Sequence, residues 1–284
     1  MARQIPFTKM HGLGNDYVYV NAIENPLDNP EGLSVIWSDR HKGIGSDGLI
    51  MICSSEIADF RMRMFNNDGS EGMMCGNGAR CVARFLHDKK LTDKTEIRLE
   101  TLAGIKILKL HLTNQDEVES VTVDMGQGLP ELVCRENGEK TELIRETVTV
   151  NGNSYTGTAI NMGNPHLVLL VDDAEKAPVA EDGSLLEVNS MFPNKVNVEF
   201  AQVIDRTHVR MRVWERGSGI TQACGTGACA TAVALAMAGL TDSKGCEIRM
   251  DGGALTVSWD PETRTVLMTG TATTVFEGTI EIPE

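Results

Sequence analysis

Short runs of alternating or β-branched apolar residues recur along the chain with polar turns between them, a pattern that is typical of strands. In the first half the predicted strands are Tyr17–Val20, Phe60–Phe65, Glu96–Thr101, Ile105–Leu112 and Val121–Met125. In the second half they are Leu167–Val171, Val196–Val203, His208–Trp214, Ala254–Trp259 and Val266–Thr269. Two apolar stretches, Ala79–Leu86 and Ala228–Ala238, predict helices, and the second is so uniformly apolar that we expect it to be buried on all sides. Each half is therefore predicted to be mostly sheet around one buried helix, an α+β fold.

The two halves repeat each other along the chain. Asn15 and Asn164, each preceded by glycine, open an apolar run, and a cysteine follows each of them by 60 residues. The cysteines, Cys75 and Cys224, thus share the same offset as the asparagines, 224 − 75 = 149. Each begins a Cys-Gly-Xaa-Gly-Ala turn. A coincidence between glycine-rich turns is the alternative, but the shared offset argues against it, and we infer an internal duplication.

The length of 284 residues suits one large or two medium domains, and the repeat favours two. We place them at residues 1–130 and 131–284, with a C-terminal tail of about residues 270–284 that can return to the first domain. A linker is predicted within residues 125–151, where glycines, a proline and a polar stretch interrupt the strand pattern.

The composition excludes several classes of partner. A formal net charge of −14, from 26 basic and 40 acidic side chains, opposes binding to nucleic acid or to an anionic membrane surface. The N-terminal residues 1–9 lack the pattern of a signal peptide, and no apolar run approaches the ~18 residues of a membrane span. Seven cysteines, an odd number in a chain of this size, indicate reduced thiols. We expect a cytoplasmic protein.

Two of the cysteines have a setting that favours chemistry. Cys75 and Cys224 each directly precede a Gly-Xaa-Gly turn at the start of a predicted helix. The free amides and the dipole of a helix N-terminus lower the pKa of a thiol from ~8.5 to roughly 3.5–7.5, so we expect both to ionise. The remaining five are interpreted as small core residues: Cys53, Cys81, Cys134, Cys229 and Cys246.

Other site types fit the sequence less well. The spacings from Cys75 to Cys81 and from Cys224 to Cys229, six and five residues, do not place two zinc ligands on one helical face. A Gly-Xaa-Gly-Xaa-Xaa-Ala motif follows Cys224, but the surrounding strands do not predict the βαβ unit of a dinucleotide site. A Cys/His/Asn hydrolase using His166 would need one nucleophile, whereas this chain offers two equivalent ones.

Paired thiols suit inversion at a carbon centre. Removing a proton from one face and returning it to the other requires a base on one side and an acid on the other. A duplicated cysteine supplies one for each face, with one thiolate and one thiol titrating as a coupled pair. The sequence therefore predicts a two-base epimerase or racemase.

The motifs that surround these cysteines resemble those of the diaminopimelate epimerase family. They occur in the family's order and span essentially the whole chain: Met10–Asp16, Phe65–Glu71, Cys75–Arg80, Gly163–His166, Glu215–Gly217 and Cys224–Gly227. The resemblance implies two similar, pseudo-twofold-related domains, each a mostly antiparallel sheet wrapped around a central helix. It also implies conversion between LL- and meso-diaminopimelate for lysine and peptidoglycan synthesis, by a homodimer that uses neither pyridoxal phosphate nor metal.

The resemblance also assigns roles to residues beside Cys75 and Cys224. It implies that the substrate's amino and carboxylate groups are held by Asn15, Asn66, Asn164, Asn197, Glu215 and Arg216. Backbone amides at the two turns would bind the carboxylate beside the reacting carbon, at Gly76, Asn77, Gly225 and Thr226. His166 and Glu215 would lie near the thiols and assist them.

Two positions depart from the family's pattern. Gly48 stands where some relatives carry a glutamine that contacts substrate, and Phe276 stands where a tyrosine is often associated with dimer packing. Two other functions stay open on the sequence. One is a proline or hydroxyproline racemase or epimerase with the same two-thiol logic, and the other is a non-catalytic amino-acid binding module of the same fold.

Overall fold

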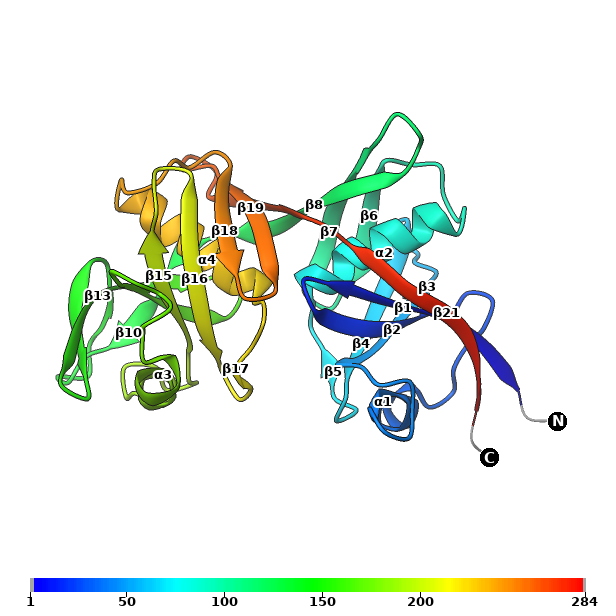
Figure 1. Cartoon of the computed structure of the whole chain (residues 1–284), viewed down its shortest axis with the longest axis horizontal. Helices are drawn as coiled ribbons and strands as arrows, with labels where there is room; N and C mark the ends of the chain where they lie inside the picture. The colour runs from blue at the N-terminus through cyan, green and yellow to red at the C-terminus, as the bar shows by residue number, and fades with distance from the viewer. Residues whose placement is uncertain (1–2, 283–284) are drawn as a thin grey trace. The chain divides into compact units, whose positions relative to one another are not determined.

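The computed structural model describes residues 3–282 and divides the chain into two compact units. Unit 1 comprises residues 1–124 and 269–284, and unit 2 comprises residues 125–268. The chain thus enters unit 2 once and returns to unit 1 for its C-terminal strand (Figure 1). The predicted halves were 1–130 and 131–284, so the first crossing lies six residues earlier than expected, and the tail belongs to unit 1.

Unit 1 is built from two helices and a set of mostly short strands. The helices are α1 (Pro30–Ser38) and α2 (Gly76–Asp88). The strands are β1 (Gln4–Gly12), β2 (Asn15–Asn21), β3 (Gly48–Cys53), β4 (Phe60–Asn66), β5 (Glu71–Gly72), β6 (Glu96–Thr101), β7 (Gly104–Leu112), β8 (Val118–Gln127), which runs on into unit 2, and β21 (Thr273–Glu281).

Unit 2 repeats this composition. Its helices are α3 (Val179–Glu187) and α4 (Gly225–Met237). Its strands are β9 (Leu129–Pro130), β10 (Leu132–Cys134), β11 (Lys140–Glu142), β12 (Glu146–Val150), β13 (Asn153–Asn161), β14 (Pro165–Leu170), β15 (Asn197–Val203), β16 (His208–Glu215), β17 (Gly219–Ile220), β18 (Cys246–Met250), β19 (Gly253–Trp259) and β20 (Thr265–Gly270), which ends in unit 1.

The inferred duplication holds at the level of whole elements. Helices α3 and α4 begin 149 residues after α1 and α2, and strands β13 and β15 begin 149 residues after β1 and β3. Strand pairing repeats as well: β2 and β3 pair in parallel, as do β14 and β15, and β3–β4 and β15–β16 are antiparallel. The two units therefore share one folding pattern, and equivalent residues can be compared across them.

In each unit one 13-residue helix lies against the strands and is buried by them (Figure 1). Helix α2 packs on β1, β2 and β7, and α4 packs on β13, β14, β15 and β19. The side chains of α4 are buried from Gly227 to Leu235, as the apolar stretch predicted. The predicted α+β fold, with a sheet around a buried helix in each half, is confirmed.

The prediction of a linker within residues 125–151 is wrong, because this segment forms strands of unit 2. Residues 125–151 are not an open connection, because they contain the end of β8 and the strands β9 to β12 of unit 2. Gly128 was interpreted as a strand breaker, but a Cβ there would lie 2.8 Å from Val233 Cγ2 on α4. Glycine is needed at this position for close packing. Within residues 3–282, no helix is both long and apolar enough to cross a membrane.

Candidate functional site

Cys75 lies at the N-cap of α2 in unit 1. Its backbone is extended (φ −131°, ψ 117°), and its sulfur accepts a hydrogen bond from the amide of Gly78 at 3.3 Å. The thiol is in turn 3.2 Å from Oδ1 of Asn15, to which it can donate. The same oxygen accepts from Nδ2 of Asn77 at 3.4 Å. Three of the predicted site residues are thus joined at one oxygen.

Asn15 is held in place by a charged network that the sequence did not predict. Its Nδ2 donates to Oδ2 of Asp47 at 2.8 Å, and Arg40 bonds both Asp47 and Asp16. Lys9, which is buried, pairs with Asp16 at 2.6 Å. Burial alone would raise the pKa of Asp16, but the hydrogen bonds from Arg40 and Lys9 outweigh it and hold that pKa below its ordinary value. The network fixes the orientation of the Asn15 amide.

Arg80, which is fully buried on α2, stabilises the turn after Cys75. Its guanidinium donates to Oδ1 of Asn77 at 2.8 Å and to the carbonyl of Thr271 at 3.1 Å. A Cβ at Gly12 would come within 2.9 Å of this guanidinium, so β1 passes very close to it. Gly76 and Asn77 are consequently buried and fixed.

Asn66 lies at the end of β4, beside Gly48 in the antiparallel pairing with β3. Its Nδ2 donates to Oγ of Ser70 at 3.0 Å. A Cβ at Gly48 would lie 2.0 Å from the carbonyl oxygen of Phe65, so the strand pair leaves no room for a side chain there. The glutamine contact of some relatives therefore has no equivalent side chain in this chain.

Cys224 occupies the equivalent N-cap on α4 in unit 2, with an extended backbone (φ −118°, ψ 108°). Its sulfur accepts from the amide of Gly227 at 3.4 Å and lies 3.6 Å from Oγ1 of Thr226. The expectation that this thiol ionises readily is wrong for the structure as it stands. Burial raises the pKa of Cys224 well above its ordinary value, and the charges of Glu215 and Glu199 add to the effect. These outweigh the helix N-terminus.

Glu215 ends β16 and is itself perturbed. Burial raises its pKa, a hydrogen bond from Oγ1 of Thr221 opposes the shift, and the charge of Glu199 adds to it. A carboxyl group with a raised pKa beside a thiol is a candidate for proton exchange.

His166, in β14, is completely buried between two partners. Its Nδ1 is 2.7 Å from Oε1 of Glu199, and its Nε2 is 3.0 Å from Oδ1 of Asn164. The structure thus links two predicted site residues, His166 and Asn164, through a direct hydrogen bond. It adds a carboxylate, Glu199, that the sequence did not single out.

Asn197 and Arg216 meet at the ends of β15 and β16. Asn197 is buried, donates to the carbonyl of Pro165 at 3.1 Å and accepts from the amide of Arg216 at 3.0 Å. The Arg216 side chain is exposed and donates to the carbonyl of Asn194 at 3.0 Å. Arg216 is exposed because it lies in the turn after β16 rather than in the strand.

Comparison with known proteins decides the family. The family model for diaminopimelate epimerase matches residues 7–129 and 158–275. A diaminopimelate epimerase of Parabacteroides distasonis is 54% identical over 282 residues, which cover 99% of this chain and 100% of that protein. The chain belongs to the diaminopimelate epimerase family. The family and the enzyme class predicted from the sequence, an isomerase, are confirmed.

Solved structures agree about the fold of this epimerase. A PhzF-family phenazine biosynthesis protein of Bacillus anthracis matches with a TM-score of 0.74 at 18% identity, covering 99% of this chain and 100% of that one. A hydroxyproline epimerase of Agrobacterium vitis, with bound trans-4-hydroxy-L-proline, matches with a TM-score of 0.69 at 17% identity, covering 100% and 95%. At such low identity these likenesses establish the fold and not the substrate.

Ten of the thirteen predicted site residues of this epimerase occupy equivalent places in the two units. Each pair is separated by 149 residues: Asn15 and Asn164, Asn66 and Glu215, Cys75 and Cys224, Gly76 and Gly225, Asn77 and Thr226. In each unit they gather where the strand ends meet the N-terminus of the buried helix. Residues that the sequence missed lie directly behind them: Asp47, Arg80, Glu199 and Thr221. For Glu199 the sequence does hold a signal: the residue 149 positions earlier is the apolar Ile50, so an acid replaces an apolar residue at an equivalent position.

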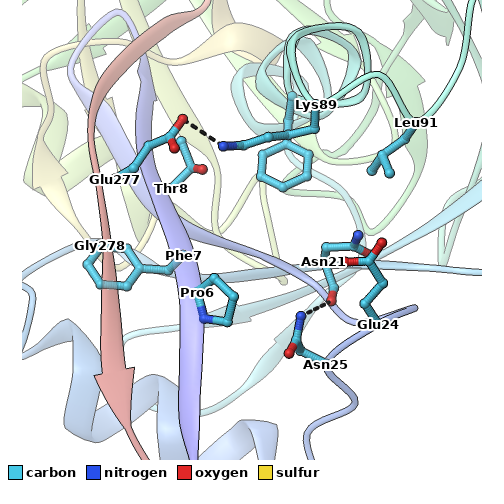
Figure 2. A pocket seen from close by; sticks show the side chains of 11 residues that line it. Pro6, Phe7, Thr8, Asn21, Glu24, Asn25, Lys89, Leu91, Glu277 and Gly278 are labelled. Atoms are coloured by element: carbon cyan, nitrogen blue, oxygen red, sulfur yellow. Dashed lines mark hydrogen bonds and ion pairs between the residues drawn. The ribbon is translucent and has the colours of Figure 1, made fainter.

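Other features of the epimerase are separate from these clusters. A cavity of about 240 Å³ in unit 1 lies between β1, β21 and the end of α2, with the Lys89–Glu277 ion pair at 2.7 Å on its wall (Figure 2). Its lining includes Phe7 and Asn21 but none of the predicted site residues. Among residues 3–282, no three His, Cys, Asp or Glu side chains are grouped so as to hold a metal ion.

Proposed function

We propose that this chain interconverts LL- and meso-2,6-diaminopimelate by moving a proton off and onto one α-carbon with Cys75 and Cys224. The observation that carries the proposal is the duplicated N-cap cysteine: each unit places one thiol at the N-terminus of a buried 13-residue helix. Membership of the diaminopimelate epimerase family supports the substrate. The product serves the synthesis of lysine and of peptidoglycan precursors.

One cysteine acts as base and the other as acid, and the roles exchange with the isomer that is bound. Because burial and two nearby carboxylates raise the pKa of Cys224, that residue favours the thiol form and begins as the acid. Cys75, which can donate to Oδ1 of Asn15, supplies the base for the isomer whose α-proton it faces. Glu215 and His166 assist from positions near Cys224.

Negative charge develops on the substrate carboxylate as the proton leaves. We assign its stabilisation to backbone amides in the two first helical turns, at Gly76, Asn77, Gly225 and Thr226. A helix N-terminus contributes about 0.3–2 kcal/mol through its dipole, and direct amide donors in such sites are worth about 2.7–4 kcal/mol each. In each unit the helix begins directly after the cysteine, which supports this assignment of its first amides.

The polar ends of the substrate need fixed partners. We assign them to Asn15, Asn66, Asn164, Asn197, Glu215 and Arg216, which supply amide, carboxylate and guanidinium groups for two ammonium and two carboxylate groups. An analogue without the distal ammonium and carboxylate would leave several of these groups unpaired, which is the physical basis for rejecting lysine or glutamate.

The proposal is tested by proton NMR of LL-diaminopimelate with the purified protein in deuterated water. We expect the α-proton signal to disappear as the meso isomer forms. Cys75→Ala and Cys224→Ala should each lower epimerisation by about 10³-fold or more, since each removes a proton-transfer group. Cys81→Ala and Cys229→Ala, at buried positions on the same two helices, are matched controls that keep activity. Inert diaminopimelate, or full activity in either catalytic variant, overturns the proposal.

We further propose that the epimerase is a homodimer and works in the cytoplasm. Two large apolar side chains on β21, Val275 and Phe276, are about half exposed and offer a surface for a second copy. The odd number of cysteines supports a reducing compartment. Cell fractionation of the native host tests the location, and recovery of the enzyme outside the cytoplasm would contradict it.

A further inference from the structure

Glu199 on β15 is a buried carboxylate whose role in the proposed mechanism is limited to its charge effect on the pKa of Cys224. Its side chain is completely inaccessible, and its Oε1 is 2.7 Å from Nδ1 of the equally buried His166. The other oxygen, Oε2, is buried without a hydrogen-bond partner among residues 3–282. A buried and half-satisfied carboxylate costs stability, so its presence requires an explanation.

The duplicated unit shows that the fold does not need a carboxylate at this position. The counterpart of Glu199 is Ile50, also fully buried and likewise the third residue of its strand. Both side chains lie under the first turn of the helix. A Cβ at Gly78 would meet Ile50 Cδ1 at 2.6 Å, and a Cβ at Gly227 would meet Glu199 Oε1 at 2.7 Å. An isoleucine fills this place adequately in unit 1, so the acid in unit 2 serves something other than packing.

The contacts of Glu199 indicate its role in unit 2. The carboxylate accepts from Nδ1 of His166, while the carbonyl oxygen of the Asn164 side chain accepts from Nε2 at 3.0 Å. An amide oxygen can only accept, so Nε2 is the donor in the second contact, while Nδ1 is occupied by Glu199. With its oxygen engaged, Asn164 is left with its NH₂ group free, and that group has no hydrogen-bond partner within the described residues.

We propose that Glu199 is a positioning residue that, through His166, orients the Asn164 amide so that its NH₂ group faces a carboxylate of the substrate. The inference rests on the proposed function. Without the carboxylate, Nδ1 loses its partner and can carry the ring hydrogen, so Nε2 becomes an acceptor and the Asn164 amide then turns over. Its oxygen would face the substrate, which repels a carboxylate and suits an ammonium group. Glu199 thus helps to decide which end of an amino acid this asparagine binds.

The kinetic test compares two replacements. Glu199→Ile copies the residue that unit 1 already accommodates and removes the acceptor, so we expect KM for diaminopimelate to rise at least about tenfold, a larger factor than the change in kcat that follows from the altered pKa of Cys224. Glu199→Gln keeps an acceptor oxygen for Nδ1, so its KM should rise less than that of the isoleucine variant. Asp182→Asn, at a buried carboxyl of the same unit that bonds Tyr155 and Asn153, is the control for general destabilisation and should leave both constants within about twofold.

A spectroscopic test needs no substrate, and its decisive arm uses the wild-type residue at position 199. In wild-type protein labelled with ¹⁵N-histidine, the His166 signals, assigned by their loss in His166→Gln, should show Nε2 protonated. In Glu199→Ile the fraction protonated at Nε2 should fall. An unprotonated Nε2 in the wild-type protein overturns the inference directly, whether or not the variants fold.

The two proposals fail in different ways. If the wild-type enzyme does not act on diaminopimelate, the proposed function fails while the histidine spectrum still reports on Glu199. If the wild-type enzyme is active but Glu199→Ile matches it in KM and in the His166 spectrum, only the role of Glu199 is overturned.

Discussion

Cys75 and Cys224 begin equivalent helices but lie in different electrostatic surroundings. Cys75 is partly exposed and shares a neutral amide oxygen with Asn77, whereas Cys224 is buried near two carboxyl groups. Nearby acids raise the pKa of a thiol, because the thiolate is repelled. Cys224 is therefore held in the thiol form before substrate binds, although the duplication makes the two cysteines geometrically alike.

The effect of the nearby acids on the pKa of Cys224 predicts how the reactivity of this thiol changes when one acid is removed. In substrate-free Glu215→Gln the nearby negative charge is gone, so the pKa of Cys224 falls and more thiolate is present at any pH below it. We expect alkylation of Cys224 by iodoacetamide at pH 8–9 to accelerate about fivefold, measured by mass spectrometry of the peptide, since a full unit of pKa corresponds to about tenfold in thiolate. Asp182→Asn should leave the rate unchanged, and a slower rate in Glu215→Gln would contradict the assigned charge effect.

At the scale of single elements, the strands leave little freedom next to the site. β3 runs between β2, in parallel, and β4, antiparallel, and its first residue, Gly48, faces the backbone of Phe65. A backbone atom cannot move aside as a side-chain tip can. The glycine therefore keeps the pairing of β3 and β4 intact beside Asn66.

Gly48→Ala is accordingly expected to destabilise the protein by about 3 kcal/mol, in the range of overpacking in a rigid core. Gly104→Ala makes a matched comparison, because the added Cβ meets nothing within 4 Å. Its only cost is the left-handed φ of +92°, which should lower the free energy of unfolding by about 1 kcal/mol. Urea denaturation followed by circular dichroism measures both. Equal losses in the two variants would show that the close approach at Gly48 is relieved at no cost.

At the scale of the whole molecule, the duplication is incomplete in one respect: the last strand of the chain completes the first unit. β21 pairs with β1 along its length, from Gln4 opposite Glu281 to His11 opposite Thr273. The edge-to-face contact of Phe276 with Phe7, with ring centroids 5.9 Å apart, holds it there. The side chains that β21 leaves exposed are the surface we assign to the homodimer.

Light scattering after size exclusion tests that assignment. We expect the wild-type chain to elute at twice the mass of 30.9 kDa and Val275→Asp to shift it toward the monomer, because a charge would be buried at an apolar contact. Leu132→Asp, at a similarly exposed leucine of unit 2, is the control and should remain dimeric. A monomeric wild-type chain, or a dimer indifferent to Val275→Asp, would refute this surface.

The sequence alone determined what depends on local pattern. Alternating runs gave strands such as Glu96–Thr101 with the same bounds as β6, because a half-buried strand needs a side chain inward at every second residue. The offset of 149 residues gave the duplication, and the two Cys-Gly-Xaa-Gly turns gave the start of both buried helices. Strands with weaker patterns, such as β1, were missed, since buried Thr8 and Lys9 look polar until their partners are known.

Only the tertiary structure decided the surroundings of the chemical groups. Burial and two carboxylates, which lie on β15 and β16, raise the pKa of Cys224. They outweigh the helix N-terminus, which by itself would lower that pKa. Glu199 meets His166 because β14 and β15 pair in parallel in one particular register, with His166 opposite Asn197. Arg216 lies exposed because its turn leaves the sheet. Charge and desolvation act through space over a few ångströms, so residues distant in sequence set them, and no local pattern of residues records which ones those are.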